Sequence, residues 1–523
     1  MIEHFPFFLA LIVVILLLIM LADKIKVAYP VLLVITGLII SFFPGIPKIQ
    51  IKPELIFIIF LPPLLYDAAF AMSWKELWRW RRIVGSFAFV VVFLTAFSVA
   101  LVANWCIPGI SLALGFLLGG IVSPPDAVSA SAILKFVKLP RRMSSIMEGE
   151  SLLNDASSLI IFRFAMLTVA TGQFVWHEAA LSFGWMVIGG SVIGLAVGWL
   201  FMKAHQLLPT DANIDIVLSF VTPYVMYIAA EEVHSSGVLA VVSGGLLLAN
   251  RRHIFLSSSS RLRGVNVWQS FVFVLNGVVF LLIGLDLPEI NEGLKQEGIE
   301  LPLAIGYGLV ITAVLIIGRI IASFGAVVTT KIMSHFIQVA DPNPGWKAPV
   351  LLSWSGMRGV VSLAAALSIP VEVNGVPFPH RNLILFITFV VILTTLVLQG
   401  LTLPWLIKKL ELPDYGDYLP EEETEAMLKR GMAEHSLHYF HQNYRKHLVT
   451  NEILRTKVAL WEQKSHEEPE ELTEETKRIY LDVLEQQRLW LQNKNNTDDK
   501  IDEEVVRKLL HGIDLDEEKL RYS

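Results

Sequence analysis

The segments SPPDAV, at residues 123–128, and SWSGMRG, at residues 353–359, interrupt two long apolar stretches of the chain. Each combines helix breakers with a charged residue. Pro124 and Pro125 remove two backbone donors, and glycines loosen the second segment. Backbone that leaves the helical conformation in lipid must line a cavity or contact protein, because lipid cannot satisfy its hydrogen bonds. The two segments therefore predict an all-α membrane protein with two interrupted helices.

The composition of the chain is that of a membrane protein. Of 523 residues, 54% are hydrophobic and 17% charged, and the mean hydropathy is +0.58. Acidic residues gather toward the end, so we expect a transmembrane domain over residues 1–410 and an acidic, mainly helical cytoplasmic tail over residues 411–523. The single cysteine, Cys106, excludes a disulfide framework and cysteine-based metal centres. We expect no resident cofactor and no nucleic-acid partner.

Apolar stretches of roughly 17 to 25 residues, the length that crosses a bilayer, can be marked off by charge, proline and glycine. Thirteen spans are expected, at residues 5–21, 30–43, 55–70, 83–105, 111–133, 145–171, 179–202, 214–230, 237–249, 266–285, 301–328, 349–369 and 383–407. The first span is not expected to be a removed signal peptide. Lys and Arg concentrate in the odd-numbered connections, which places those connections and the tail in the cytoplasm and the N-terminus outside.

The two interrupted spans are the fifth and the twelfth, so they cross the membrane in opposite directions. This spacing is expected if spans one to six and eight to thirteen are inverted repeats. Paired interrupted helices at corresponding positions point to the central site of a transporter. The competing interpretation is a pair of ordinary kinks in a membrane receptor.

Ionisable residues retained within membrane spans are candidates for function, because burying each one is unfavourable. The candidates are Asp67, Asp126, Glu150, Asp155, Arg163, Arg319 and Arg358.

The sixth span reads GESLLNDASSLIIF from Gly149, and one of its faces presents a carboxylate among neutral oxygens. Ser151 and Asp155 are separated by one helical turn, and Asn154 lies beside them. Together with Asp126 from the first break, these side chains supply hard oxygen ligands for a transported monovalent cation, with Asp155, Ser151 and Asp126 as its direct ligands. A buried carboxylate that binds either a proton or a cation, but not both, performs antiport by competition.

The remaining charged residues have structural interpretations. We expect Glu150 to pair with Arg358, which would tie the sixth span to the twelfth. Arg319 is expected to balance Asp126 or the carbonyls of a broken helix. Asp67 is either a hydrated vestibule residue or a direct ligand, and Arg163 either pairs with a carboxylate or lies at the membrane interface.

Four segments resemble those of the cation/proton antiporter family that includes bacterial NhaP-type antiporters and animal Na⁺/H⁺ exchangers. FLPPLLYDAA, GGIVSPPDAV, GESLLNDA and SGMRGVVSLAAAL occur in the family's order, and the resemblance covers about residues 5–410. It implies a homodimer with a dimerisation domain, a mobile six-helix core and elevator-like alternating access.

The resemblance places the family's Asn-Asp pair on Asn154 and Asp155, its serine on Ser151, and its structural charge pair on Glu150 and Arg358. An asparagine before the aspartate is similar to the electroneutral branch, which implies exchange of one cation for one proton. One departure from many relatives is Pro125, which stands where they carry Thr, Ser or Val before the aspartate.

Several alternatives remain open from the residues. The cation is expected to be Na⁺, with K⁺ and Li⁺ as alternatives, because ligand spacing does not resolve cavity radius. An intramembrane aspartyl protease is a weaker hypothesis: Tyr66 and Asp67 match half of its motif, but the GxGD partner is missing. A channel is disfavoured because no filter-like repeat occurs. We therefore expect a multi-pass transporter of the cell membrane, with the bacterial inner membrane as its expected location, and not an enzyme.

The tail carries acidic clusters and heptad-like apolar positions that predict short amphipathic helices with regulatory contacts. The apolar positions are Leu472, Ile479, Val483 and Leu489. The tail also contains the histidines His435, His438, His441 and His447, which are interpreted as pH-sensing or metal-binding groups or, preferably, as solvated helix residues.

Overall fold

The computed structural model describes residues 5–43, 53–126, 129, 137, 139–172, 176–285, 287–336, 345–373, 375–412, 421–444, 452–466, 474–497 and 503–521. The chain divides into two compact units, Met1–Asp414 and Tyr415–Ser523.

The first unit is built almost entirely of helices. Its first half contains α1 (Phe5–Ile25), α2 (Tyr29–Ser41), α3 (Pro53–Ala71), α4 (Trp74–Gly85), the π-helical turn η2 (Ser86–Val91), α5 (Val92–Cys106), α6 (Leu112–Val122), α8 (Arg141–Thr171) and α9 (Trp176–Leu207). Its second half contains α10 (Ala212–Glu232), α11 (Gly237–Phe255), α12 (Ser258–Leu285), α13 (Leu287–Gln296), α14 (Leu301–Met333), α15 (Lys347–Trp354), α16 (Val360–Leu367) and α17 (Arg381–Leu410). A short hairpin joins α16 to α17, and each of its strands, β1 (Glu372–Val373) and β2 (Val376–Pro377), has two residues.

Seven helical segments among the described residues are long and apolar enough to cross a membrane. Three shorter apolar helices accompany them, at Tyr29–Ser41, Ile58–Ala71 and Leu112–Val122. The multi-pass helical prediction is confirmed, whereas the count of thirteen spans stays a prediction. The predicted fourth span is the C-terminal part of one continuous helical segment, Trp74–Cys106, which includes α4, η2 and α5.

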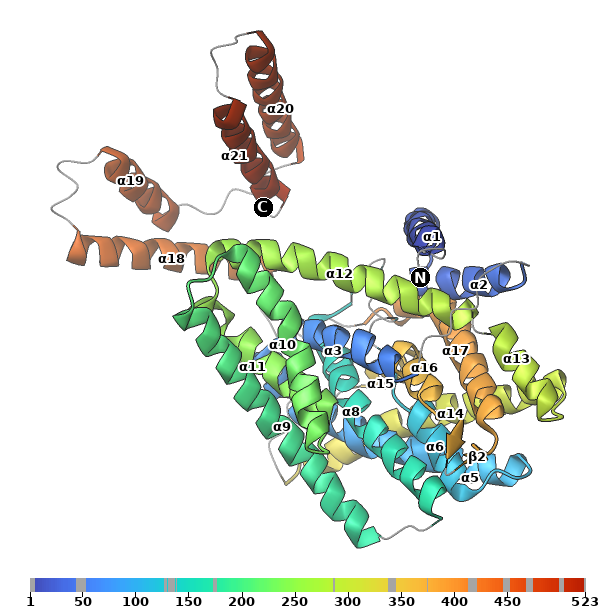
Figure 1. Cartoon of the computed structure of the whole chain (residues 1–523). Helices are drawn as coiled ribbons and strands as arrows, with labels where there is room; N and C mark the ends of the chain where they lie inside the picture. Colours follow the sequence, from blue (N-terminus) through green and yellow to red (C-terminus); the bar gives the residue numbers. More distant parts are fainter. Residues whose placement is uncertain are drawn as a thin grey trace. The chain divides into compact units, whose positions relative to one another are not determined.

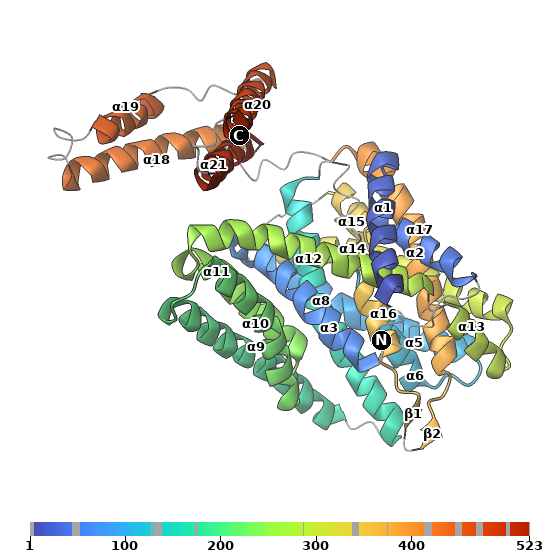
Figure 2. The same cartoon turned by 45° about the horizontal axis from the view of Figure 1, so that its top comes forward.

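The transmembrane helices form two packing groups. In the first, which we call the α11 group, α2, α3, α9, α10, α11 and α12 pack mainly against one another. We call the second the α8 group. Its members also pack mainly against one another, and they are α5, α6, α8, α14, α15 and α17. Figures 1 and 2 both show α9, α10 and α11 side by side, away from α5, α6 and α14.

Glycine allows close contact within the α11 group. A Cβ atom added at Gly194 of α9 would lie 2.0 Å from the Ala240 carbonyl oxygen of α11. Only glycine permits this approach, and small residues at helix contacts are typical of membrane proteins. The packing inside the group is therefore tight.

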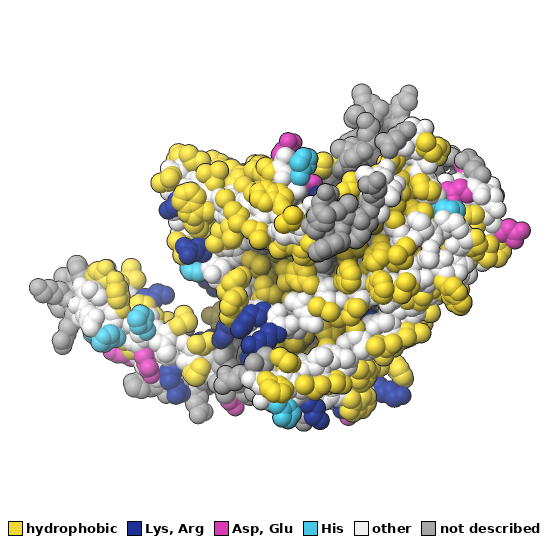
Figure 3. All heavy atoms as spheres, turned by 90° about the horizontal axis from the view of Figure 1, so that it is seen from below, with side chains coloured by type: hydrophobic (Ala, Val, Ile, Leu, Met, Phe, Trp, Pro, Cys, Tyr) yellow, Lys and Arg dark blue, Asp and Glu magenta, His cyan; other side chains and the backbone are white. Residues whose placement is uncertain are grey.

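The outer surface of the helices is apolar. Figure 3 shows hydrophobic side chains over most of the face seen from below, with charged side chains in a few clusters. Large apolar residues such as Leu181 and Trp105 are 75% and 87% exposed. Such a surface is unfavourable in water and is explained by contact with lipid.

The second unit is a set of tail helices. It contains α18 (Glu421–Asn443), α19 (Glu452–His466), α20 (Glu474–Thr497) and α21 (Glu503–Arg521), where α18 packs against α19 and α20 against α21. Arg488 of α20 donates to Asp514 and Glu517 of α21 at 2.9 and 2.8 Å. These acceptors, with Glu485, raise the pKa of Arg488, so its charge is permanent.

The heptad-like positions predicted for the tail can be compared with this unit. Leu484 is buried on α20, whereas the expected heptad positions Ile479, Val483 and Leu489 are exposed, because the helix packs through a different face. Leu472 lies outside the described residues.

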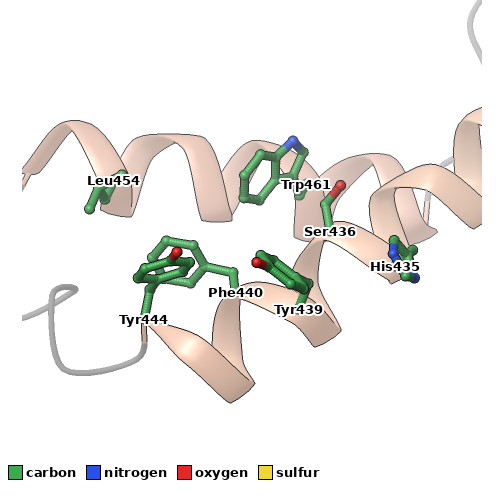
Figure 4. A pocket seen from close by; sticks show the side chains of 7 residues that line it. All are labelled: His435, Ser436, Tyr439, Phe440, Tyr444, Leu454 and Trp461. Atoms are coloured by element: carbon green, nitrogen blue, oxygen red, sulfur yellow. The ribbon is translucent and has the colours of Figure 1, made fainter. Parts of the chain in front are cut away.

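The aromatic side chains of α18 and α19 line a pocket of about 750 Å³, shown in Figure 4. His435 is at its edge, and the His438 ring contacts Gln442. His447 lies outside the described residues, and within the described part of the chain no three His, Cys, Asp or Glu side chains cluster as metal ligands.

Candidate ion-binding site

The two interrupted helices cross at their breaks, where a backbone hydrogen bond joins them. α6 ends at Val122, and residues 355–359 separate α15 from α16. The Asp126 N–H donates to the Met357 carbonyl, with 2.7 Å between nitrogen and oxygen. Pro124 and Pro125 have no N–H, so the helix cannot continue through them. The predicted interruptions are confirmed, and the crossing brings residues far apart in the sequence into contact.

Asp126 is held at the crossing by close packing. A Cβ atom added at Gly359 would lie 1.8 Å from the Asp126 Oδ2 atom, a distance that no side chain tolerates. The Ser129 hydroxyl donates to the same oxygen at 2.7 Å. Gly359 thus leaves the space in which the Asp126 carboxylate lies.

The Asn-Asp pair of α8 faces this crossing. Asn154 is fully buried, and its Nδ2 donates to the Pro125 carbonyl at 3.1 Å. Its Oδ1 is buried without a hydrogen-bond partner among the described residues. Asp155 is 7% exposed and close enough to Asp126 for the two carboxylates to interact electrostatically. Ser151, one turn earlier, is half-buried.

The serines after Asp155 contact backbone. The Ser157 hydroxyl donates to the Ala88 carbonyl in η2 and to the Asn154 carbonyl, the latter at 2.9 Å. The Ser158 hydroxyl donates to the Asp155 carbonyl at 3.1 Å. A π-helical turn leaves carbonyls out of the regular pattern, so Ala88 can accept from a neighbouring helix. Sequence reasoning did not find this link between η2 and α8.

The predicted pair of Glu150 with Arg358 is wrong in this structure, because Glu150 pairs with Arg319 of α14. Arg319 Nη1 and Nη2 lie 2.6 and 2.9 Å from the two carboxylate oxygens of Glu150. Arg319 Nε also donates to the Leu352 carbonyl at 3.0 Å. All three nitrogens of the guanidinium therefore donate to α8 or α15, in the fork geometry that arginine provides.

Arg358 takes the role that was expected of Arg319 and neutralises the carbonyls of a broken helix. Its Nε donates to the Val122 carbonyl at 2.8 Å and its Nη2 to the Ser123 carbonyl at 3.2 Å. The carbonyl end of a helix carries partial negative charge and has unsatisfied acceptors. The exchange of roles has a physical cause, since Arg358 lies in the break that crosses the end of α6.

Arg163 has a carboxylate partner, which decides between its two interpretations. Its Nη2 lies 2.5 Å from Glu231 Oε2 at the end of α10. Glu231 was missed because it ends a span and does not interrupt one. Asp67 is half-buried on α3, and its role as a vestibule residue or ligand stays a prediction.

A second buried polar cluster was also missed. His205 Nδ1 of α9 lies 2.7 Å from Asp215 Oδ1 of α10, and the Ser260 hydroxyl of α12 donates to Asp215 Oδ2 at 2.6 Å. The cluster joins three helices of the α11 group. The sequence signal was two ionisable residues flanking a short connection.

Helices with an apolar exterior, two crossed interruptions and buried carboxylates define a multi-pass membrane protein with the architecture of a secondary transporter. The transmembrane sodium/hydrogen exchanger family matches residues 10–409, and the chain belongs to this family.

Named relatives agree with this assignment. The chain is 35% identical over 390 residues to a sodium, potassium, lithium and rubidium/H⁺ antiporter of Bacillus pumilus; the match covers 73% of this chain and 58% of that protein. It is 32% identical to the Na⁺/H⁺ antiporter ApNhaP of Aphanothece halophytica, over 78% of this chain and 74% of the relative. The chain thus spans little more than half of the Bacillus protein.

A solved structure shares the fold. The sodium proton antiporter MjNhaP1 of Methanocaldococcus jannaschii aligns with a TM-score of 0.62 at 18% identity, over 78% of this chain and 99% of that chain.

Proposed function

We propose that this protein exchanges Na⁺ or another alkali cation for H⁺ by competition of the two ions for Asp155. The observation that carries the proposal is a nearly buried carboxylate, 7% exposed, beside the crossing of two interrupted helices. The names of the relatives, which are antiporters, support the same activity.

The electrostatics of the site favour occupancy by one positive ion. Asp155 and Asp126 repel each other when both are ionised, and burial strengthens this repulsion. A proton on Asp155 or a cation between the carboxylates relieves it. The empty site is negatively charged, so it is the least stable form of the site within a low-dielectric barrier. The conformational change that exposes the site to the other side of the membrane is therefore coupled to the binding of a proton or a cation.

The proposed ligands of the transported cation are Asp155, Asp126 and Ser151, with Asn154 nearby. The unpartnered Oδ1 of buried Asn154, among the described residues, supports a polar environment there, because a buried acceptor without a partner is unfavourable. A carboxylate with neutral oxygens suits a monovalent cation, since it avoids an excess of negative charge.

We assign an electroneutral one-for-one stoichiometry to the exchange. Position 154 carries an amide, and its Nδ2 is committed to the Pro125 carbonyl. Asp155 is therefore the single carboxylate of the Asn154–Asp155 pair, and it exchanges one proton for one cation.

Alternating access is assigned to motion of the α8 group against the α11 group. Each group packs mainly within itself, which supports movement as two bodies in an elevator-like manner. The family resemblance implies a homodimer, and we assign its dimerisation domain to the α11 group. The basic connections place the start of α8 in the cytoplasm and its end outside.

The transported cation is Na⁺ or another alkali cation. The Bacillus relative is named for sodium, potassium, lithium and rubidium, so K⁺/H⁺ exchange is kept as the alternative to Na⁺/H⁺ exchange. Cavity radius and ligand placement decide between these ions.

The test is transport by purified protein in vesicles with an imposed pH gradient, to which Na⁺, K⁺ or Li⁺ is added. We expect cation-dependent proton flux that Asp155→Asn abolishes and that a voltage clamp does not alter. Asp211→Asn is the matched control, because Asp211 caps α10 and asparagine caps equally well. Flux that persists in Asp155→Asn, or no flux with any cation, would refute the proposal.

A further inference from the structure

An open cavity lies between α8 and α10 on the side of Asp155 remote from the start of α8. Its volume is about 380 Å³, and its lining includes Leu159, Arg163, Tyr227, Glu231 and Glu232. The Arg163 guanidinium and the Glu231 carboxylate meet here at 2.5 Å, with their side chains 35% and 29% exposed. Glu231 Oε1 also accepts from the Gly237 N–H at 3.1 Å. An ion pair therefore stands in the wall of a polar-rimmed cavity.

The cavity lies in line with the ion site. Asp155, Leu159 and Arg163 are four residues apart along α8, so their side chains follow one stripe of the helix. Eight residues of helix correspond to about 12 Å. Leu159 lines the cavity and is 7% exposed, so it separates the Arg163–Glu231 pair from Asp155.

The pair also bridges the two packing groups. Arg163 belongs to α8, which packs against α6, α4 and η2, while Glu231 belongs to α10, which packs against α9, α11 and α12. An ion pair between bodies that move relative to each other must break when they part. Its partial exposure makes breaking feasible, because water replaces the lost contact.

We propose that Arg163 and Glu231 form the outer gate of the cation path, closing the route from outside to Asp155 when paired and opening it when separated. This gate rests on the antiport proposed above. The pair has a second consequence, since Glu231 neutralises a guanidinium that would otherwise repel cations at the entrance. Both residues are positioning residues and do not bind the transported ion.

The first test measures access through the gate in vesicles. In a Cys106→Ala background, Leu159→Cys places a single thiol between the gate and Asp155, and a membrane-impermeant methanethiosulfonate is added from the outer face. We expect Glu231→Gln to raise the modification rate at least about three-fold. Glu232→Gln is the matched control, because it removes the same charge from the same cavity, and it should leave the rate unchanged. Equal rates in Glu231→Gln and its parent would overturn the gate.

A second reporter and a charge exchange protect this test from folding defects. Ile160→Cys, also on the cavity wall, replaces Leu159→Cys if that variant loses transport.

Glu231→Arg should raise the apparent KM for cation supplied from outside about three-fold, as expected for a like charge near the path. The double variant Arg163→Glu/Glu231→Arg should restore it, with the KM from inside unchanged throughout.

The outcomes separate the two proposals. Loss of transport in every variant, including the parent, would refute the antiport proposal. Normal antiport with no effect of Glu231→Arg on the ratio of the outer to the inner KM would refute the gate alone. A KM change of equal size on both sides would also refute it, because a structural defect has no preferred side.

Discussion

Glu150 on α8 and Arg319 on α14 form a two-pronged ion pair, with nitrogen–oxygen distances of 2.6 and 2.9 Å and side chains 2% and 5% exposed. It links helices through residues separated by 169 positions in the chain. Because Glu150 lies little more than one turn before Asp155, the pair fixes the position of the segment of α8 that carries Asp155.

Removing one member of this pair should destabilise the protein strongly. Glu150→Gln leaves a buried guanidinium without its counter-charge, and the expected loss is about 3–5 kcal/mol in the free energy of unfolding. Thermal unfolding in detergent measures it. Glu148→Gln, an exposed position on the same helix, should change the stability by less than about 0.5 kcal/mol. A similar small change in both variants would contradict the importance of the buried pair.

Gly359→Ala should abolish antiport without removing any charge. Its methyl group would overlap the Asp126 carboxylate, which must move from the crossing. We expect at least a ten-fold loss of the cation-dependent flux in vesicles. Gly318→Ala on α14 is the control, since no atom lies within 4 Å of the added Cβ atom. Full activity of Gly359→Ala would show that the position of Asp126 is not essential.

Arg358→Lys should impair transport although it keeps the positive charge. Lysine cannot reproduce the two directed contacts from Nε and Nη2 to the carbonyls at the end of α6. We expect a several-fold lower flux and a lower unfolding temperature. Arg251→Lys, at an exposed position, provides the comparison and should behave like the parent. If Arg358→Lys equals the parent too, charge alone suffices at the end of α6.

Asn154→Ala should loosen the contact between α8 and the first break. It removes the hydrogen bond to the Pro125 carbonyl and leaves that oxygen unsatisfied, a loss of about 1–3 kcal/mol. Unfolding in detergent and transport in vesicles should both show the defect. Asn266→Ala, at an exposed position on α12, should show neither. Unchanged stability in Asn154→Ala would mean that water replaces the amide.

Local patterns in the sequence were sufficient to predict the class of fold and the carboxylates that lie at the crossing of the two breaks. Proline and glycine act on their own stretch of backbone, so the breaks after Val122 and after Trp354 were visible in the residues themselves. Asp155 was visible for a similar reason, because ionisable groups at membrane depth are rare, and Asn154 directly precedes it in the sequence.

The partners of the buried charges were not predictable in this way. Glu150 needed a cationic partner, and the sequence favoured Arg358 because it lies in the second break, whereas the structure pairs Glu150 with Arg319. The choice of Arg319 over Arg358 depends on how α14 packs against its neighbours and on how the second break crosses α6. Arg163 and Glu231 illustrate the same limit, since a residue at the end of a span has no local sign of its partner.

The sequence alone determined that this protein spans a membrane, that two of its helices are interrupted, and that a carboxylate follows an asparagine within one apolar stretch, which is α8. The tertiary structure decided which arginine neutralises Glu150, which carbonyls receive Arg358, and which helices Arg163 and Glu231 connect. The physical reason is that helix breaking and membrane burial act over a few neighbouring residues, whereas an ion pair depends on distances between helices that only the packed fold sets.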